Sequence, residues 1–462
     1  MTSAHALAGL WRLAGLPAEA LGFADLTGAD PVFPSSFHVG TAAQASIAAA
    51  ALAACELGHL RGAPRQRVAV DMGHAAVECT GWFSLDGRVP DPWDAFSGLY
   101  RTADGFVRLH ANFAHHRNGA LALLGLDPAT ATRSDAESAL LGWRAIDFED
   151  ATARQGLVAT ALRRFDEWDA TPQGRALAGQ PLFTIERIAG TEADPPLTLP
   201  ALAADARPLA GVRVLELTRI LAGPVGGRAL AAYGADVMLV NAPHLPNIEA
   251  IADTSRGKLS AWADLRTAEG RADLDRLIDD AHVFVQGYRP GGLAALGYGP
   301  EALAVRRPGI VCVSLSAYGT QGPWAGRRGF DSLVQTAMGF NHAEGEAQGD
   351  GAPRPMPMQI LDEATGYLIA FGAAAALRRQ QQEGGSWHVQ VSLAQTGCWL
   401  RAMGRVPGGL SGARPDVAPY AESVPSGFGQ LGGIRHSARL SRTPAAWTRL
   451  SVPPGSSPAR WP

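Results

Sequence analysis

The chain has 462 residues, of which 47% are hydrophobic and 18% are charged, and its formal net charge is −3 at pH 7. This composition is typical of a globular chain with two or more domains, and the balanced charge argues against a nucleic-acid or membrane-surface partner. The four cysteines lie far apart without a CxxC pair, so we expect no metal site, no disulfide framework and a cytoplasmic location.

The first region, residues 1–190, is expected to form a second structured domain of α+β type. Its opening stretch, residues 1–23, has apolar residues at helical spacing and no basic n-region, which predicts an amphipathic helix rather than a signal peptide. The Asp-Gly pair at 104–105 predicts a β-hairpin, with a helix after it. His115 and His116 could contact a substrate, but a histidine pair beside an arginine in a polar loop is more typical of solvated surface.

Strands and helices alternate after a Pro- and Ala-rich linker at residues 191–210. Short, continuous apolar runs such as "GVRVLEL", "ADVMLVN" and "AHVFVQG" are separated by helical patterns, as a parallel sheet buried on both faces requires. We therefore expect residues 211–400 to form an α/β domain with an open, doubly wound parallel sheet. The Pro/Gly-rich tail, residues 401–462, is expected to be mostly irregular, with one strand near 435–441.

The first strand-to-helix turn, "TRILAGPVGG", has glycines near a helix start, a pattern that can bind phosphate. It is not GxGxxG, however, and the second strand ends in Asn241 instead of the acid that would hold a nicotinamide ribose. The sequence therefore disfavours an enzyme that transfers hydride.

Two Ala-rich segments, residues 42–78 and 363–399, can be superimposed in sequence at an offset of 321 residues, the difference between 362 and 41. At this offset Thr41 falls opposite Asp362, and the strand patterns "VAVDM" and "VQVSL" coincide. The similarity indicates either an internal repeat or two Ala-rich helices that are alike in composition alone. In a true repeat, only the second copy would carry the acid.

Three stretches occur in order between residues 211 and 393: "GVRVLELTRILAGPVGGRALAAYGADVMLVN", a long one that begins "RGKLSAWADLRTAEGRADL", and "LDEATGYLIAFGAAAAL" with "HVQVSL" after it. Together they resemble the family III CoA-transferases, which include the formyl-CoA:oxalate and carnitine CoA-transferases, with α-methylacyl-CoA racemase as a close relative. Upstream, "TADGFVRLHANFAHHRNGALALLG" is similar to the family's second domain, and the tail resembles its closing segment. Material similar to the distal half of the family thus precedes the proximal half, an unusual fused order.

The resemblance places Asp362 at the position of the family's nucleophilic aspartate. An acid just ahead of a long helix can occupy the N-cap or the first turn, where free N–H groups and the positive end of the dipole favour the carboxylate and offset the effect of burial on its pKa. The alternative is that Asp362 is a structural cap, which is the more common role of aspartate before a helix.

The resemblance also implies a set of residues that bind CoA. Lys258, the chain's only lysine, lies in the family's nucleotide-phosphate segment, where a compact ammonium suits a phosphate, although a stray lysine in an arginine-rich chain is the simpler interpretation. Tyr288 keeps an aromatic ring for adenine. The complete set is Arg219, Leu221, Lys258, Tyr288, Arg289 and Tyr318.

The resemblance implies a CoA-transferase that moves CoA from an acyl-CoA donor to a small carboxylic acid, with the CoA thioester as substrate and no permanently bound cofactor. Asp362 would attack the thioester, and the reaction would pass through a mixed anhydride and an aspartyl-CoA thioester. The expected partners are acyl-CoA, the acceptor acid and a second copy of the chain in an interlocked homodimer, with no nucleic acid or membrane.

Two alternatives stay open. An α-methylacyl-CoA racemase has a histidine in "GHD", where this chain has Phe330 in "GFD", and a phenyl ring cannot move a proton. A degenerate CoA-binding protein would bind without turnover. The family's asparagine, a nearby arginine and a basic position after the second strand are replaced here by Gly287, Ala295 and Ala242, which reduces the contacts expected to CoA.

Overall fold

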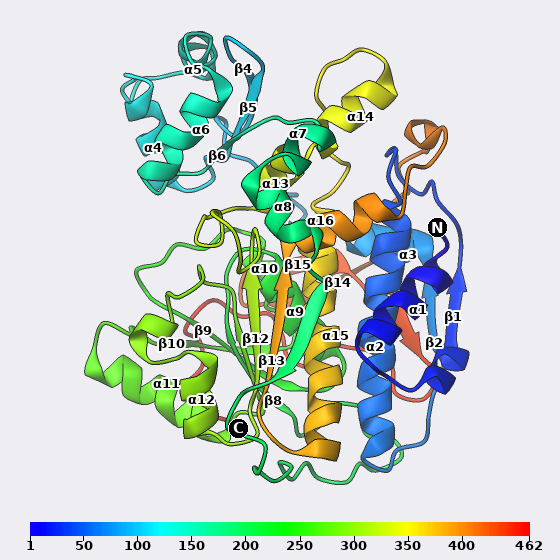
Figure 1. The fold of residues 1–462 in the computed structure, drawn as a ribbon. Helices are drawn as coiled ribbons and strands as arrows, with labels where there is room; N and C mark the ends of the chain where they lie inside the picture. Colours follow the sequence, from blue (N-terminus) through cyan, green and yellow to red (C-terminus); the bar gives the residue numbers. More distant parts are fainter.

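The centre of the protein, whose computed structural model describes residues 1–462, is a seven-stranded sheet (Figure 1). Its order is β10-β9-β8-β11-β12-β13-β7, and all neighbours are parallel except β7, which pairs antiparallel with β13. The expected α/β fold with a parallel sheet is confirmed. The strands are β7 (Phe183–Arg187), β8 (Arg213–Leu217), β9 (Asp236–Asn241), β10 (Lys258–Trp262), β11 (Val283–Gln286), β12 (Val311–Ser316) and β13 (Trp387–Ser392).

Successive side chains of these strands enter two different hydrophobic layers, because side chains alternate between the faces of a sheet. Val214 of β8 belongs to the larger layer, and its neighbour Leu215 belongs to the smaller one. Helices cover both faces, which is why the strands are apolar without interruption. They are α9 (Ala222–Ala232) and α15 (Ile360–Glu383) on the larger layer, and α11 (Ala268–Asp280) and α12 (Pro300–Arg306) on the smaller layer.

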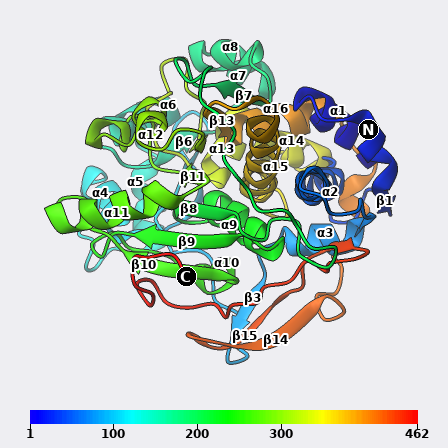
Figure 2. The ribbon, with the colours of Figure 1, turned by 90° about the horizontal axis from the view of Figure 1, so that it is seen from below.

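The long helix α2 (Val39–Leu60) packs along α15, and the two lie side by side in both views (Figures 1 and 2). Each is long and apolar enough to cross a membrane by length and composition, but both are fully buried inside the protein. Their alanines allow close approach of the two backbones. One continuous core of 79 buried residues therefore runs from Ala6 to Leu440 and joins the N-terminal segment to the sheet.

A small α+β unit stands apart from this core, at the top left of Figure 1. Its nine-residue core includes Phe148 and contains only residues between 100 and 148. The hairpin expected at 104–105 is confirmed, since β4 pairs antiparallel with β5. The unit comprises β4 (Gly98–Arg101), β5 (Phe106–Leu109), β6 (Ala159–Ala161), α4 (Ala114–Leu123), α5 (Arg133–Leu140) and α6 (Ala145–Arg154). The expectation that residues 1–190 form one domain is corrected: the segment around α2 shares the core of the sheet.

The tail is more regular than its Pro/Gly content suggests. β16 (Ala438–Leu440) forms where the sequence predicts a strand, and it pairs with β2 (Val68–Asp71), which pairs in turn with β1 (Ala24–Thr27). The tail also forms a hairpin that the sequence did not predict, since its strands contain serine together with glycine and proline, which are uncommon in strands. That hairpin consists of β14 (Ala421–Ser426) and β15 (Gly429–Ile434), and it pairs with β3 (Phe83–Leu85) at the lower edge of Figure 2.

The remaining elements connect these layers. Residues 191–210 form no helix or strand and lead from β7 to β8. The helices not yet named are α1 (Ser3–Leu13), α3 (Met72–Glu78), α7 (Phe165–Asp169), α8 (Pro172–Ala178), α10 (Ile251–Thr254), α13 (Asp331–Met338), α14 (Phe340–Gln348) and α16 (Leu393–Ala402). Three short 3-10 turns are η1 (Ala18–Phe23), η2 (Ala294–Leu296) and η3 (Gly409–Ser411).

The structure supports the internal repeat. α2 and α15 begin at residues 39 and 360, and α3 and α16 begin at residues 72 and 393, so both pairs of starts differ by 321. The residues before the long helices, His38 and Gln359, have nearly equal backbone angles of −75°, 55° and −83°, 61°. The side chains of Asp71 and Ser392 cap the second helices in the same way. Composition alone would not reproduce these caps.

Candidate active site

Asp362 is the third residue of α15 and lies in the first turn of the helix. The residue is buried, with 8% of its surface exposed. It is not the N-cap, because that position is Gln359, which makes no capping hydrogen bond. The backbone N–H of Asp362 donates to Oδ2 of Asp331, 2.9 Å away. The helix start is therefore held by another carboxylate, so the Asp362 side chain remains free for chemistry.

Asp331 is fully buried in the first turn of α13, and its other oxygen accepts a hydrogen bond from Gln335 at 2.5 Å. Burial raises the pKa of Asp331 to about 7, although the hydrogen bonds it accepts act in the opposite direction. Burial and then the negative charges of Asp331 and Glu363 raise the pKa of Asp362 well above its usual range. The expectation that the helix start offsets the effect of burial is corrected: desolvation and like charge together raise the pKa of Asp362.

Glu363, the next residue, points into the protein interior. It is 1% exposed, and neither carboxyl oxygen has a hydrogen-bond partner in the protein. Burial raises the pKa of Glu363 to about 8, and the positive charge of Arg228 opposes the shift. A carboxyl group in this environment stays protonated at neutral pH, which removes one negative charge from the neighbourhood of Asp362.

The small α+β unit contributes arginine and histidine side chains next to the start of α13, close to Asp331. The ring of His110, just after β5, stacks on Phe330 with centroids 4.0 Å apart, and His116 of α4 meets the edge of the same ring. The positive charge of Arg108 on β5 acts on Asp331. Burial lowers the pKa of His110 to about 3 and that of His116 to about 4, so both imidazoles are neutral.

Four buried nitrogens near this junction have no hydrogen-bond partner within the protein: Nε of Arg108, Nδ1 of His110, Nδ1 of His116 and Nε of Arg219. Buried polar groups without partners are rare in native proteins, and several at one place indicate a site that a polar ligand completes. The expectation that the histidine pair lies in a solvated polar loop is corrected in part: both residues are helical and His116 is 4% exposed, whereas His115 is exposed as expected.

Arg219 follows β8 at the carboxyl edge of the sheet, and its guanidinium lies 5.5 Å from the ring centre of Phe113 in the small unit. The turn continues through Ile220, whose φ of +76° is a costly conformation for a β-branched residue, to Leu221 before α9. The nearby glycines serve helix packing. A Cβ on Gly226 would meet the backbone oxygen of Gly366 on α15 at 2.9 Å, so α9 starts against the turn that follows Asp362.

Tyr288 and Arg289 follow β11 at the same edge, because the carboxyl ends of parallel strands lie together. Tyr288 is half-buried near Arg219, whose charge acts on its hydroxyl, while Arg289 is exposed and lines a cavity of about 150 Å³. Tyr318, after β12, is 2% exposed and packs against Trp168 and Trp324. Tyr288 and Arg289 are therefore available to a ligand. The expected contact at Tyr318 is not supported, since its ring is used in the core.

Lys258 corrects the sequence analysis. Its side chain is fully buried at the start of β10, where Nζ lies 2.7 Å from Oε2 of Glu216 on β8 and donates to the carbonyl of Pro224 at 2.7 Å. Burial lowers the pKa of Lys258, and the charge of Glu216 opposes that shift. An ammonium held in this way does not reach a nucleotide phosphate. The chain's only lysine is instead half of a buried ion pair within the sheet.

Sequence reasoning missed Asp331, Arg108 and His110. Asp331 directly follows Phe330 in the "GFD" motif, so the motif gave a signal for it. Nothing in the sequence around Arg108 and His110 distinguishes them, since the contact between the small unit and α13 is made only in the folded chain. No group of three or more histidine, cysteine or acidic side chains is arranged to hold a metal ion.

A sequence profile described as CoA-transferase family III matches residues 209–407. The chain is 32% identical over 380 residues to an acyl-CoA transferase of Gibberella moniliformis, covering 73% of this chain and 66% of that one. It is 35% identical over 252 residues to succinate–glutarate CoA-transferase of Agrobacterium fabrum, covering 48% and 62%. A solved CaiB/BaiF family protein from Brucella suis is 30% identical, with a TM-score of 0.39 over 49% of this chain and 65% of that one.

The chain spans between 53% and 66% of the length of the first three curated relatives. The matched region begins just before β8 and ends after α16, so it contains the turn with Arg219, the helix starts with Asp331 and Asp362, and the whole parallel part of the sheet. On these matches and motifs, the chain belongs to CoA-transferase family III.

Proposed function

We propose that the protein transfers CoA from an acyl-CoA to a carboxylic acid, with Asp362 as the nucleophile. The observation that carries the proposal is the free side chain of Asp362 in the first turn of α15, whose backbone N–H is already bound by Asp331. A carboxylate used only as a cap would itself accept a backbone N–H at the helix start. In this protein Asp331 accepts that hydrogen bond instead.

In the first half of the reaction, a carboxylate oxygen of Asp362 attacks the acyl carbon of the thioester. The C–S bond breaks, CoA leaves as a thiolate, and a mixed anhydride joins the acyl group to Asp362. The thiolate then attacks the side-chain carbonyl of Asp362, which releases the donor as a free carboxylate and leaves an aspartyl-CoA thioester.

The second half reverses these steps with the acceptor. The acceptor carboxylate attacks the aspartyl thioester and gives a second anhydride and CoA thiolate. The thiolate attacks the acyl carbon of the acceptor part, which yields the new acyl-CoA and free Asp362. Once Asp362 has lost its proton, the two halves need no electron or further reactant, because one carboxylate replaces another throughout.

The surrounding side chains suit this chemistry. Buried nitrogens of Arg108, Arg219 and His110 have no partner within the protein, and we propose that they stabilise carboxylates and developing oxyanions of the substrates. Asp331 raises the pKa of Asp362, and a more basic carboxylate is a stronger nucleophile once it has lost its proton. The protonated state of Glu363 limits further repulsion at neutral pH.

For the CoA moiety we assign Arg219, Leu221, Tyr288 and Arg289, which the fold gathers at the carboxyl edge of the sheet. The names of relatives give candidate acyl groups. Similar proteins are called succinate–glutarate CoA-transferase, succinyl-CoA–D-citramalate CoA-transferase and probable fatty acyl-CoA transferase. We therefore propose a dicarboxylate such as succinate or glutarate as one of the two acids.

Two further features belong to this proposal. We propose a cytoplasmic homodimer, as the family resemblance implies. Within one chain, however, β7 already pairs with β13 and α2 packs on α15, so these contacts need no exchange of elements with a partner. Light scattering at micromolar concentration tests the dimer, and a stable monomer would remove it.

Mass spectrometry of the intact protein after incubation with acetyl-, succinyl-, glutaryl- and a long-chain acyl-CoA tests the function. The expected result is one covalent CoA per chain, removed by hydroxylamine and mapped to the peptide that contains Asp362. Thr41→Ser, at the equivalent place of the repeat, is the matched control and should form the same adduct. CoA binding without any adduct from all four donors would favour a degenerate CoA-binding protein.

A further inference from the structure

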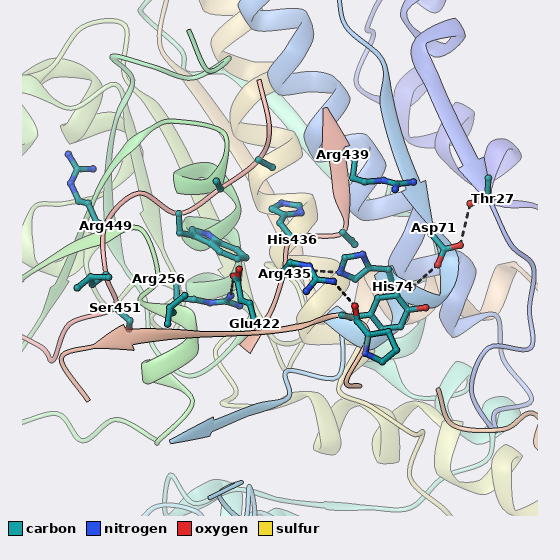
Figure 3. Close-up of a pocket in the computed structure, with 18 residues that line it drawn as sticks. Thr27, Asp71, His74, Arg256, Glu422, Arg435, His436, Arg439, Arg449 and Ser451 are labelled. Atoms are coloured by element: carbon teal, nitrogen blue, oxygen red, sulfur yellow. Dashed lines mark hydrogen bonds and ion pairs between the residues drawn. The ribbon is translucent and has the colours of Figure 1, made fainter. Parts of the chain in front are cut away.

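A cavity of about 840 Å³ lies away from Asp362. It lies between β16, the β14–β15 hairpin and the segment 445–451, beside α3 and the end of α10 (Figure 3). None of the residues assigned above to catalysis or CoA lines it. Its volume is in the range of sites that bind small molecules.

Positive charge dominates its wall. Four arginines and two histidines line the cavity, against the two acids Asp71 and Glu422. Arg256 is paired with Asp253 at 2.6 Å and Arg449 with Asp236 at 2.7 Å. The remaining two, Arg435 and Arg439, have no carboxylate partner, although the guanidinium of Arg435 donates to the carbonyls of Ala421 at 2.7 Å and Pro419 at 2.5 Å. Figure 3 shows Arg439 at one side of the cavity and Arg449 at the other.

Two neutral groups in the same wall are buried and lack partners. His436 is 7% exposed, and its Nδ1 accepts a hydrogen bond from the backbone N–H of Ala438 at 3.1 Å. Because burial lowers the pKa of His436 to about 4, its single ring proton is on Nε2, which has no partner in the protein. The hydroxyl of Ser437, 1% exposed, has none either. Both residues belong to the wall of the cavity.

The segment that carries these groups is held firmly. Oε2 of Glu78 accepts the backbone N–H of Ser437 at 2.7 Å, and its Oε1 accepts the hydroxyl of Tyr367 at 2.6 Å. On the outer side, the ring of Tyr420 stacks on that of His74, with centroids 4.6 Å apart. Donors fixed in place by the surrounding structure lose little freedom when a ligand binds.

We propose that this cavity is a binding site for an organic phosphate of nucleotide size, separate from the CoA-transferase site and independent of its chemistry. Arg435 and Arg439 neutralise its phosphate groups, and the Nε2–H of His436 and the hydroxyl of Ser437 donate hydrogen bonds. Planar guanidinium groups match phosphate oxygens in pairs. A bare phosphate would leave most of the volume unfilled, and the distribution of the arginines requires a longer ligand with more than one charge.

Isothermal titration calorimetry of the full chain with ADP, inorganic pyrophosphate and citrate tests the proposal. We expect ADP to bind. Arg439→Gln should weaken ADP roughly tenfold to a hundredfold, and Ser437→Ala about two- to tenfold, without changing the melting temperature. Arg442→Gln removes an exposed arginine of the same tail outside the cavity and should bind ADP like the parent.

Three results would overturn the site: no heat with ADP at millimolar concentration, equal ADP affinity in the parent and in both cavity variants, or binding of citrate in place of ADP. Pyrophosphate that binds as tightly as ADP would overturn the proposed size of the ligand. Because CoA itself contains a phosphorylated nucleotide, the titrations are repeated in Arg219→Gln, which alters the residues assigned to CoA and leaves the cavity unchanged. ADP binding at parental affinity together with weakened CoA binding separates this site from the transferase site, and an equal loss of both would place ADP in the CoA site.

Discussion

The carboxylate of Asp331 receives the backbone N–H of Asp362 at 2.9 Å, and the same contact occurs a second time in the molecule. Oδ2 of Asp30 receives the N–H of Thr41 at 3.0 Å, at the start of the equivalent helix α2. In the first copy the hydroxyl of Thr41 also donates to that oxygen, at 2.7 Å, so the side chain is used to fix the helix. Only the second copy leaves a carboxyl group free.

Replacing Asp362 by asparagine should abolish turnover and leave stability close to that of the parent. An amide forms neither the anhydride nor the aspartyl thioester. Because the contact with Asp331 uses the backbone N–H, it survives the substitution. Transferase rates and chemical denaturation measure the two effects. Full activity, after deamidation to aspartate has been excluded, would contradict the nucleophilic role.

Asp331→Asn should move the rising limb of the pH–rate profile to lower pH. The negative charge of Asp331 raises the pKa of Asp362, and Asp362 must lose its proton to attack. Without that charge the pKa of Asp362 falls, so the ionised nucleophile is reached at lower pH, by roughly one unit. The profile of kcat against pH at saturating substrates shows the shift.

Asp30→Asn is the matched control for this substitution, because Asp30 makes the same contact at the start of the helix without a nucleophile. It should leave the pH–rate profile in place and lower stability by about 0.5–2 kcal/mol, the usual value of a helix-start contact. An identical pH shift in both variants would show that Asp331 acts only through helix stability.

Glu363→Gln should make stability less dependent on pH. The pKa of Glu363 is raised to about 8 in the folded protein, so between the unfolded value of 4.5 and 8 the folded state binds the extra proton. The protonated Glu363 makes its full contribution to the free energy of unfolding below pH 4.5. Between pH 4.5 and 8 that contribution falls, by up to about 1.4 kcal/mol per pH unit. The free energy of unfolding of the glutamine variant should therefore rise relative to that of the parent as the pH is raised from 5 to 8.

Urea denaturation at several pH values measures that difference. Glu383→Gln is the control at the other end of α15, where the carboxylate is half exposed and forms a surface pair with Arg187 at 3.0 Å. Its free energy of unfolding should follow the parent at every pH. Parallel pH curves for Glu363→Gln and the parent would show that Glu363 is not buried in its neutral form.

Lys258→Met should destabilise the protein by about 3–5 kcal/mol, because it leaves Glu216 buried without its partner. Adding Glu216→Leu removes the orphaned charge and should restore most of the stability. Folded Lys258→Met protein should bind CoA with parental affinity, since the ammonium is 1% exposed or less. A large loss of CoA affinity with stability retained would return Lys258 to the phosphate site.

The sequence by itself determined that the domain is built on a parallel sheet, where several of its strands lie along the chain, and the helix that carries Asp362. These features depend on local patterns: runs of β-branched residues such as residues 211–217 must be buried on both faces, and an Ala-rich run of helical length has few other structures available. The family motifs also lie within continuous stretches. Position 362 could therefore be assigned before any contact was known.

Only the tertiary structure decided which residues stand around that position. Lys258 and Glu216 lie on strands that flank β9, so their pairing depends on strand order and not on spacing along the chain. His110 reaches Phe330 across 220 residues of sequence, through the contact of the small unit with α13. The cavity is assembled from residues between 27 and 451. Local periodicity says which face of an element is buried, but the partner of that face is fixed by the path of the whole chain.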